Sequence, residues 1–231
     1  MKYFIDTEFL EGKQGKRFLG IKYGETKPTI DLISIGIVCE DGREYYVISK
    51  DFNLKEAWER YDLELDIDNG GMKKVYWIRE NVLKFIYYDL CFKDEEPLNS
   101  KNNPLNFSYE TLKNLISKYG KTNKQIAEEI KQFVGTKETI ENWEEIKYKM
   151  NTQFYGYYSD YDWVVFCWLF GRMIDLPRGF PMYCIDLKQE LDNYVSTGKK
   201  LFKTLPRQTN EHNALRDARW NYELYKFLQQ L

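Results

Sequence analysis

A β-branched apolar run, TIDLISIGIV at residues 29–38, is the feature that most restricts how this chain can fold. Its composition favours a strand buried inside a sheet. The EDG that follows at 40–42 is typical of a hairpin turn, so REYYVIS at 43–49 is expected to pair back as the next strand. KYFID at 2–6 is expected to form the first strand and to end in carboxylates. The N-terminal part is therefore predicted to be an antiparallel meander.

The region from about residue 50 to 150 has mainly helical patterns. We expect helices in KEAWERYD, in KKVYWIRENVLKFIYYDL and in NKQIAEEIKQFV. In the last of these, Ile126, Ile130, Phe133 and Val134 recur at helical spacing. Between the helices, KDEEPLNSKNNPLN at 93–106 is polar and holds two prolines, which indicates a loop or an insertion.

Strands and helices alternate in the C-terminal part. TQFYGYY at 152–158 is predicted to be a strand, DWVVFCWLFGRM at 162–173 an apolar helix, and PMYCIDL at 181–187 another strand. A final helix is expected from about residue 213, with an apolar stripe of Ala214, Ala218, Tyr222, Tyr225 and Leu228. The whole pattern predicts one α/β domain over residues 1–231, with a mixed five-stranded sheet flanked by helices.

Composition limits the classes of protein to which this chain can belong. It is 43% hydrophobic and 30% charged, its mean hydropathy is −0.64, and no apolar run approaches the length of a membrane span. Asp6 would interrupt the apolar core of a signal peptide, so we expect a cytoplasmic protein. The net charge of −2 disfavours a protein whose whole surface binds nucleic acid. An enzyme that binds a few nucleotides through metal ions is compatible with this net charge.

The four cysteines carry no metal-binding or disulfide pattern. They are widely scattered and form no CxxC pair, and Cys39, Cys91 and Cys167 have apolar neighbours. Reduced thiols in the core are therefore favoured over a zinc site or disulfide bonds.

Asp6 and Glu8, in IDTEF, are the first candidate metal ligands. Residues i and i+2 of a strand project from the same face, so these two carboxylates are expected to lie together. Their mutual repulsion would raise both pKa values unless a cation neutralises them. Oxygen ligands of this kind select Mg²⁺ or Mn²⁺. The alternative is a solvated strand end, because a DxE pair is common by chance.

A second candidate lies in YYSDYDWVVFCWLFG at 157–171. Asp162 follows an aromatic residue where a predicted strand leads into an apolar helix, and Asp160 competes with it. Either residue also suits a first helical turn, where a carboxylate favours the helix dipole and Ser159 could cap the helix. Taken alone, this aspartate is more typical of a helix start than of a ligand.

The third candidate is EHNALRDAR, which contains His212, the single histidine of the chain. We expect His212 to precede the last helix and Asp217 to lie on the second turn of that helix. An imidazole there could approach a metal ion bound by Asp217, and its reference pKa near 6.5 suits a proton acceptor. A surface histidine is the alternative.

The order of these three motifs resembles that of the DEDDh group of 3′-to-5′ exonucleases, whose fold is ribonuclease H-like. Within that group the chain is similar to the small exoribonucleases related to the mycobacterial polyadenylate-specific enzyme. The resemblance rests on DTEF, DLISIGIV with EDGREYY, YDWVVFCWLFGRMIDLP and HNALRDAR. It covers the first 50 residues and about 125–230. The stretch from about 85 to 125 is therefore expected to be an insertion.

The resemblance implies a two-metal exoribonuclease that removes nucleoside 5′-monophosphates from the 3′ end of single-stranded RNA, with A-rich tails as one candidate substrate. Asp6, Glu8 and Asp217 would hold one Mg²⁺ or Mn²⁺, Asp6 would bridge to a second ion, and Asp162 would complete the site. His212 would accept the proton of the attacking water. Relatives are often dimers, so a homodimer is also implied.

Substrate contacts are expected to differ from those of many DEDDh enzymes. Tyr157 and Tyr158 stand where many of them carry a His-Asn pair, and no Thr-Gly pair follows Glu8. Thr7 and Phe9 flank the acidic pair, and Phe9 could stack on the terminal base or belong to the core. The segments GKQGKR at 12–17 and TGKK at 197–200 could guide phosphates or be solvated turns.

Three other interpretations are considered. The same chemistry could act on DNA, because no motif reveals contacts to a 2′-hydroxyl. The fold could also serve as a non-catalytic nucleic-acid-binding module, which the presence of all five site residues disfavours. A calcium loop beginning at Asp66 fails because Trp77 stands where a bidentate carboxylate is needed, so DLELDIDNGG at 62–71 is interpreted as an acidic turn.

Overall fold

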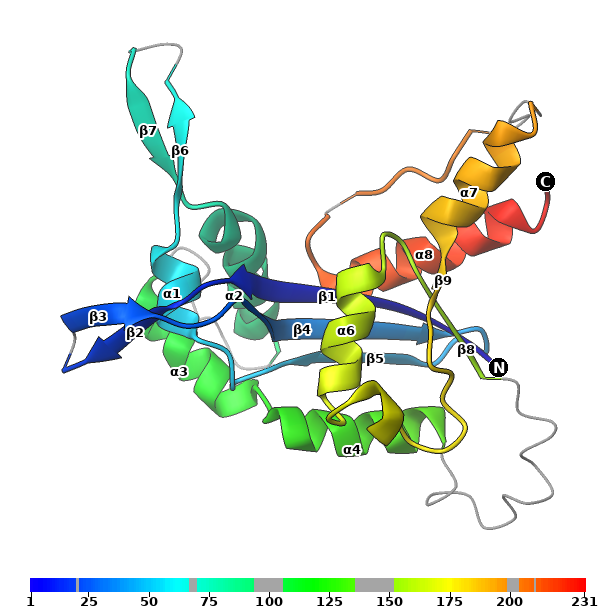
Figure 1. Ribbon diagram of the computed structural model, residues 1–231, viewed down its shortest axis with the longest axis horizontal. Helices are drawn as coiled ribbons and strands as arrows, with labels where there is room; N and C mark the ends of the chain where they lie inside the picture. Colours follow the sequence, from blue (N-terminus) through cyan, green and yellow to red (C-terminus); the bar gives the residue numbers. More distant parts are fainter. Residues whose placement is uncertain (20, 67–69, 94–105, 136–151, 199–203, 210) are drawn as a thin grey trace. The chain divides into compact units, whose positions relative to one another are not determined.

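The computed structural model describes residues 1–19, 21–66, 70–93, 106–135, 152–198, 204–209 and 211–231 (Figure 1). The chain divides into two compact units. Unit 1 consists of Met1–Phe9, Leu32–Ser49 and Lys121–Leu231, and unit 2 consists of Leu10–Asp31 and Lys50–Gly120. The predicted single domain with an insertion at 85–125 stays a prediction; residues 94–105 of that stretch lie outside the described residues.

A mixed five-stranded sheet with the order β5-β4-β1-β8-β9 is the framework of unit 1. Its strands are β1 (Lys2–Gly12), β4 (Thr29–Cys39), β5 (Glu44–Ile48), β8 (Gln153–Gly156) and β9 (Ile185–Asp186). β5 is antiparallel to β4, whereas β8 is parallel to β1 and β9 is parallel to β8. The α/β fold class, with a mixed five-stranded sheet flanked by helices, is therefore confirmed, and it is consistent with a ribonuclease H-like fold.

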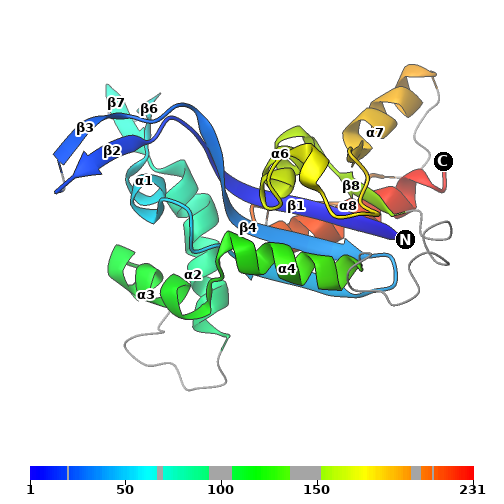
Figure 2. The ribbon, with the colours of Figure 1, turned by 60° about the horizontal axis from the view of Figure 1, so that its bottom comes forward.

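Two helices cover one face of this sheet, α4 (Asn123–Val134) and α6 (Asp160–Trp168) (Figure 2). Alternate residues of a strand point to opposite faces, and Tyr3 and Phe154 point to this one. The Tyr3 hydroxyl donates to the backbone carbonyl of Val134 on α4 at 3.0 Å. The ring of Phe154 lies 5.0 Å from that of Phe166 on α6. Aromatic packing therefore fixes both helices to the centre of the sheet.

The opposite face carries α7 (Leu187–Ser196) and α8 (Ala214–Leu228). Phe4, the neighbour of Tyr3, stacks on Tyr222 of α8 with 4.7 Å between ring centroids. Tyr155, the neighbour of Phe154, lies 4.9 Å from Tyr225 of α8. The buried stripe of α8 differs in part from the predicted one, because the tyrosines and Leu228 are only half-buried at its edge. The fully buried residues are Ala214, Asp217, Ala218, Asn221, Leu224 and Phe227.

Unit 2 contains two antiparallel hairpins that the sequence patterns did not predict. They are β2 (Gly15–Phe18) with β3 (Ile21–Glu25), and β6 (Asp62–Leu65) with β7 (Met72–Val75). The predicted basic loop at 12–17, acidic turn at 62–71 and helix start at KKV are therefore wrong in part, because each contributes a strand. All four residues of β6 are exposed, so this strand shows no apolar alternation. The helical segments of unit 2 are α1 (Leu54–Glu59), the π-helix η1 (Arg79–Leu83), α2 (Lys84–Cys91) and α3 (Tyr109–Tyr119).

Several strands and helices of unit 1 begin or end at other residues than predicted. β1 does not end in carboxylates but continues to Gly12. α6 ends at Trp168, before the end of the predicted range 162–173, because the chain turns into the short 3₁₀-helix η3 (Met173–Asp175). The predicted strand at 181–187 is reduced to Ile185–Asp186, since Asp186 begins α7 as its N-cap. α4 begins as its sequence indicates, with a capping box between Thr122 and Gln125.

All four cysteines are free; Cys39, Cys91 and Cys167 are buried and Cys184 is half-buried. Within the described parts of the chain, no helix has the length and apolar character needed to cross a membrane.

Candidate active site

β1 presents its polar residues to the two faces of the sheet in turn. Asp6 and Glu8 share the face of Phe4, which is covered by α8, whereas Thr7 points to the face of α6. Asp6 keeps partial access to solvent, and Glu8 is 9% exposed. Because β1 is a central strand, its backbone fixes both carboxylates. They are therefore held together inside the structure instead of separating in water.

The start of α8 brings Asp217 to the same face. Asn213 caps the helix by accepting a hydrogen bond from the Arg216 backbone N–H, so Asp217 falls in the first helical turn rather than the predicted second. Carboxylate oxygens of Asp6, Glu8 and Asp217 all lie within 4.8 Å of one another. The three carboxylates form the carboxylate cluster of this site. The sequence brought Asp6 and Glu8 together by strand spacing, and packing of α8 adds Asp217.

Two contacts hold α8 in this position. Gly36 of β4 lies against the first residues of α8, and a Cβ added there would stand 2.2 Å from the carbonyl oxygen of Ala214. The buried Asn221 side chain donates to the backbone carbonyl of Ile5 at 2.8 Å, next to Asp6. Only glycine permits the first contact, and an amide donor is needed for the second. Gly36 lies within DLISIGIV, but the sequence patterns assigned no role at the site to Gly36 or to Asn221.

Asp162 lies in the first turn of α6 and is buried, whereas Asp160 is exposed. The backbone N–H and the hydroxyl of Thr7 both donate to Asp162 Oδ1, at 2.8 and 2.6 Å. Thr7 therefore ties the second-motif aspartate to β1, and its predicted substrate contact stays a prediction. Ser159 occupies the N-cap position but its side chain makes no capping hydrogen bond, contrary to expectation.

Gly156 makes the approach of α6 to β1 possible. A Cβ at Gly156 would lie 2.6 Å from Cβ of Ser159 and 3.4 Å from the carbonyl oxygen of Ile5. The chain can therefore leave β8 and begin α6 within a few residues, which places Asp162 beside β1.

The carboxylates raise one another's pKa values. Burial raises the pKa of Asp6 well above its ordinary value, and the charges of Asp162, Glu8 and Asp217 raise it further. The pKa of Glu8 is raised by burial and then by the charges of Asp217 and Asp162. Asp6 therefore experiences the charge of every other acidic residue of the site. Uncompensated negative charge of this kind is what bound divalent cations neutralise.

Hydrogen bonds limit this effect at the other two carboxylates. Burial raises the pKa of Asp162 to about 6, although the two hydrogen bonds from Thr7 oppose the shift. The pKa of Asp217 is also raised by burial, and it is lowered by a hydrogen bond from Gln208 and by backbone N–H donors. Gln208 Nε2 donates to Asp217 Oδ1 at 2.8 Å. Sequence patterns missed Gln208 because it lies outside the helix that carries Asp217.

His212 precedes α8, as predicted. Its backbone N–H donates to Asp217 Oδ2 at 2.8 Å, and its charge lowers the pKa of Asp217. The backbone of His212 has φ of 69°, a left-handed conformation that is uncommon outside glycine and asparagine. The side chain is half-buried. His212 therefore lies beside the carboxylate cluster, just before the first residue of α8.

The remaining candidates are placed as follows. Phe9 is half-buried and its ring meets that of Tyr161 edge to face at 5.8 Å, while Tyr161 is 49% exposed. Tyr157 packs against Trp220 at 4.9 Å, and Tyr158 is 65% exposed. The segment 12–17 belongs to unit 2, and residues 199 and 200 lie outside the described residues.

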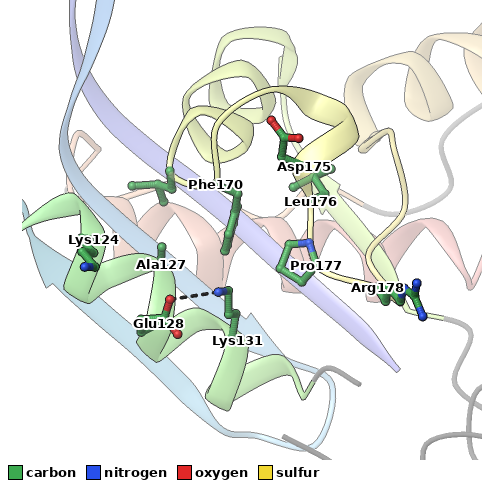
Figure 3. A pocket seen from close by; sticks show the side chains of 10 residues that line it. Lys124, Ala127, Glu128, Lys131, Phe170, Asp175, Leu176, Pro177 and Arg178 are labelled. Carbon is green, nitrogen blue, oxygen red and sulfur yellow. Dashed lines mark hydrogen bonds and ion pairs between the residues drawn. The ribbon is translucent and has the colours of Figure 1, made fainter. Parts of the chain in front are cut away.

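A cavity of about 390 Å³ in unit 1 does not coincide with these residues. Lys124, Ala127, Glu128 and Lys131 of α4 form one wall, and Figure 3 shows the ion pair between Lys131 and Glu128 there. The other wall is the segment after α6, from Leu169 to Arg178. Asp162 lies at the opposite end of α6, so this cavity is not part of the carboxylate cluster.

Comparisons with known proteins point to one activity. Two curated proteins of Mycobacterium tuberculosis are named 3′-5′ exoribonucleases, Rv2179c in strain H37Rv and MT2234.1 in strain CDC 1551 / Oshkosh. Each is 28% identical to this chain over 222 residues, which cover 95% of this chain and 88% of the relative. No family model matches the chain.

Proposed function

We propose that this protein is a metal-dependent 3′-5′ exoribonuclease that acts on single-stranded RNA. The observation that carries the proposal is the carboxylate cluster, in which oxygens of Asp6, Glu8 and Asp217 lie within 4.8 Å on two elements far apart in the sequence. The mycobacterial relatives named 3′-5′ exoribonucleases support it independently, since the similarity extends over 95% of the chain. The order of the motifs supports a DEDDh-type site.

The donor set fits divalent metal ions. Its ligands are all carboxylate oxygens, which Mg²⁺ and Mn²⁺ prefer, and their raised pKa values reflect a negative charge that the described residues do not neutralise. Asp6, Glu8 and Asp217 would hold one ion, and Asp6 with Asp162 a second. When bound, such ions lower the pKa of a coordinated water and stabilise charge on the leaving oxygen.

The protein's own residues would then share the remaining work. His212 accepts a proton from the attacking water through its imidazole nitrogen. Water adds to the phosphorus of the last phosphodiester, and the bond to the O3′ of the preceding nucleotide breaks. The released product is a nucleoside 5′-monophosphate, and the O3′ of the preceding nucleotide takes up a proton from solvent to become the new 3′-hydroxyl of the shortened strand. Thr7 and Gln208 act through Asp162 and Asp217, whose orientation they hold.

A digestion assay tests this proposal. Purified protein would be incubated with 5′-labelled single-stranded RNA and DNA oligomers of matched sequence, with Mg²⁺, Mn²⁺ or EDTA. We expect a ladder that shortens from the 3′ end, release of 5′-monophosphates, faster loss from RNA and no loss in EDTA. Faster loss from DNA would replace the proposal with a 3′-5′ DNA exonuclease. Binding of RNA without degradation in either metal would indicate a non-catalytic module.

Preference for A-rich tails, a cytoplasmic location and a homodimer stay predictions from the sequence. The same assay with oligoadenylate and oligouridylate measures the first of them.

A further inference from the structure

Unit 2 contains a cleft of about 580 Å³ that combines aromatic rings with cations. We call it the aromatic cleft. Its rings are Trp58, Tyr61 and Tyr76. Its charged lining residues are Arg17, Glu56, Glu59, Arg60, Lys74 and Arg79. Four cations and two carboxylates leave this surface positive, although the whole protein has a net charge of −2.

The β6–β7 hairpin explains why the two tyrosines meet. Asp62 of β6 pairs with Val75 of β7, so Tyr61 before one strand and Tyr76 after the other lie opposite each other at the base of the hairpin. Figure 1 shows this hairpin as β6 and β7. Their ring centroids are 5.8 Å apart. Trp58 comes from α1, and Arg79 comes from η1. Four separate elements or their flanks therefore converge on this cleft.

Two of the four cations of the cleft lie on its rings. The Lys74 ammonium is 4.1 Å from the ring centroid of Tyr61, and the Arg79 guanidinium is 3.8 Å from that of Tyr76. Such contacts keep positive charge at the surface beside the rings. Tyr61 is 43% exposed, and Lys74 is exposed as well. Aromatic surface and positive charge are thus presented together.

The two carboxylates of the lining are already neutralised. Arg17 Nη2 lies 2.6 Å from Glu59 Oε2, and Arg60 Nη2 lies 3.3 Å from Glu56 Oε1. Arg79 Nε lies 3.0 Å from Glu80 Oε1, whereas Lys74 has no carboxylate partner among the residues that the structure describes. The excess charge of the cleft is therefore concentrated beside Tyr61.

We propose that the aromatic cleft binds a short stretch of single-stranded RNA, so that the protein holds its substrate at a second place besides the carboxylate cluster. This inference rests on the proposed function, which supplies the ligand class. Unpaired bases stack on aromatic side chains and on arginine planes, and cations attract the phosphates between them. A base-paired duplex cannot offer its base faces in this way. An acidic peptide would use the cations but not the rings.

Direct binding without catalysis tests the proposal. Fluorescence anisotropy of a labelled 16-nucleotide RNA would be measured in EDTA for the full chain and for four variants. Tyr61→Ser should weaken binding by about tenfold, as expected for the loss of a base stack, whereas Tyr61→Phe keeps the ring and should bind like the parent. Lys74→Gln should weaken binding several-fold and reduce the salt dependence by about 0.7 in log–log slope. Lys73→Gln is the matched control.

The control is chosen from the geometry of β7. Lys73 and Lys74 are adjacent, exposed and equally charged, but Lys73 does not line the cleft. Equal effects of the two lysine variants would overturn the proposal, as would equal affinity of Tyr61→Ser and the parent. Binding of duplex RNA as tightly as single-stranded RNA would also overturn it. So would displacement of the RNA by polyglutamate to the same extent from the parent and from Tyr61→Ser.

The two proposals can fail separately. If the parent digests RNA but Tyr61→Ser and Lys74→Gln bind and digest 16-nucleotide RNA normally, the inference fails and the proposed function stands. If the parent digests no RNA in Mg²⁺ or Mn²⁺ but binds it in a manner that depends on Tyr61 and Lys74, the proposed function fails and the inference stands. Digestion of a dinucleotide should be unaffected in both variants.

Discussion

The carboxylate cluster of unit 1 and the aromatic cleft of unit 2 concentrate charge in opposite ways. The cluster holds like charges inside the protein, where Thr7, Gln208 and backbone N–H groups fix them. The cleft holds cations at the surface, and two of them, Lys74 and Arg79, lie on aromatic rings. Buried like charges reduce the free energy of unfolding, whereas exposed cations that lie on aromatic rings reduce it little.

This difference predicts where substitutions are tolerated. In unit 1 the carboxylates stay in place only because β1, α6 and α8 pack closely, as Gly36 and Gly156 show. In unit 2 the hairpin that carries Lys74 is exposed along all of β6. In unit 1, substitutions that shift the packed strands and helices are therefore expected to be tolerated least. In unit 2, substitutions that change the charge or the aromatic character of the surface are expected to have the larger effect.

The largest expected effect is that of Asp6→Asn. This change removes the carboxylate on which the other three act, so metal-dependent turnover should fall by more than about 10³-fold. The apoprotein should become more stable, because one of the mutually repelling buried charges is gone. Nucleotide release and urea denaturation measure the two effects. Glu11→Gln, an exposed carboxylate on the same strand but in unit 2, should change neither.

His212→Asn should lower turnover by about 10²–10⁴-fold, the usual contribution of a positioned base. Asparagine is preferred to alanine here because it tolerates the left-handed backbone at φ of 69°. Calorimetric titration with Mn²⁺ should give an affinity close to that of the parent. Parent-like turnover in this variant would remove His212 from the mechanism.

The stability of the metal-free protein should depend on pH in a direction set by raised carboxylate pKa values. Asp162 has a pKa of about 6 in the folded state against an ordinary value of 3.8, so between these values the native state keeps a proton that the unfolded chain has lost. Stability should therefore fall as pH rises through this window, by about 2–3 kcal/mol for this group. Urea midpoints in EDTA from pH 4 to 7 measure the trend. Stability that rises over this range would contradict it.

Two strand glycines allow a sharper comparison of the units. Gly36→Ala should destabilise the protein by about 1–3 kcal/mol, because the new methyl group would overlap the start of α8. It should also weaken Mn²⁺ binding, since Asp217 lies on that helix. Gly24→Ala, in β3 of unit 2, meets no atom within 4 Å and should stay within about 0.5 kcal/mol of the parent. Equal denaturation midpoints for the two variants would show that α8 adjusts freely.

Residue patterns predicted the strands and helices in which buried side chains recur at a regular spacing. β1, β4, β5 and α4 follow from apolar runs and caps because each buries a continuous face. The hairpins of unit 2 could not be found in this way, since the residues of β6 are exposed on both faces. β9 is too short to have a period, and pairing with β8 alone identifies it as a strand.

The candidate site divides in the same manner. Asp6, Glu8, Asp162, His212 and Asp217 stand in recognisable short motifs, and their order along the chain indicated one site. Gly36, Asn221 and Gln208 act on that site from positions with no local signature, because their partners are distant backbone and side-chain atoms. Thr7 was noticed for its place between two acids, but its contact with Asp162 appears only when α6 packs on β1.

The separation of the cluster along the chain also determines when it can form during synthesis. Asp217 is made more than 200 residues after Glu8, so a nascent chain that already contains β1, β4 and β5 still lacks a ligand. At translation rates of about 5–20 residues per second, this interval lasts roughly 10–40 seconds. A ribosome translating this protein is therefore not exposed to its completed carboxylate cluster until α8 has emerged and packed against Gly36.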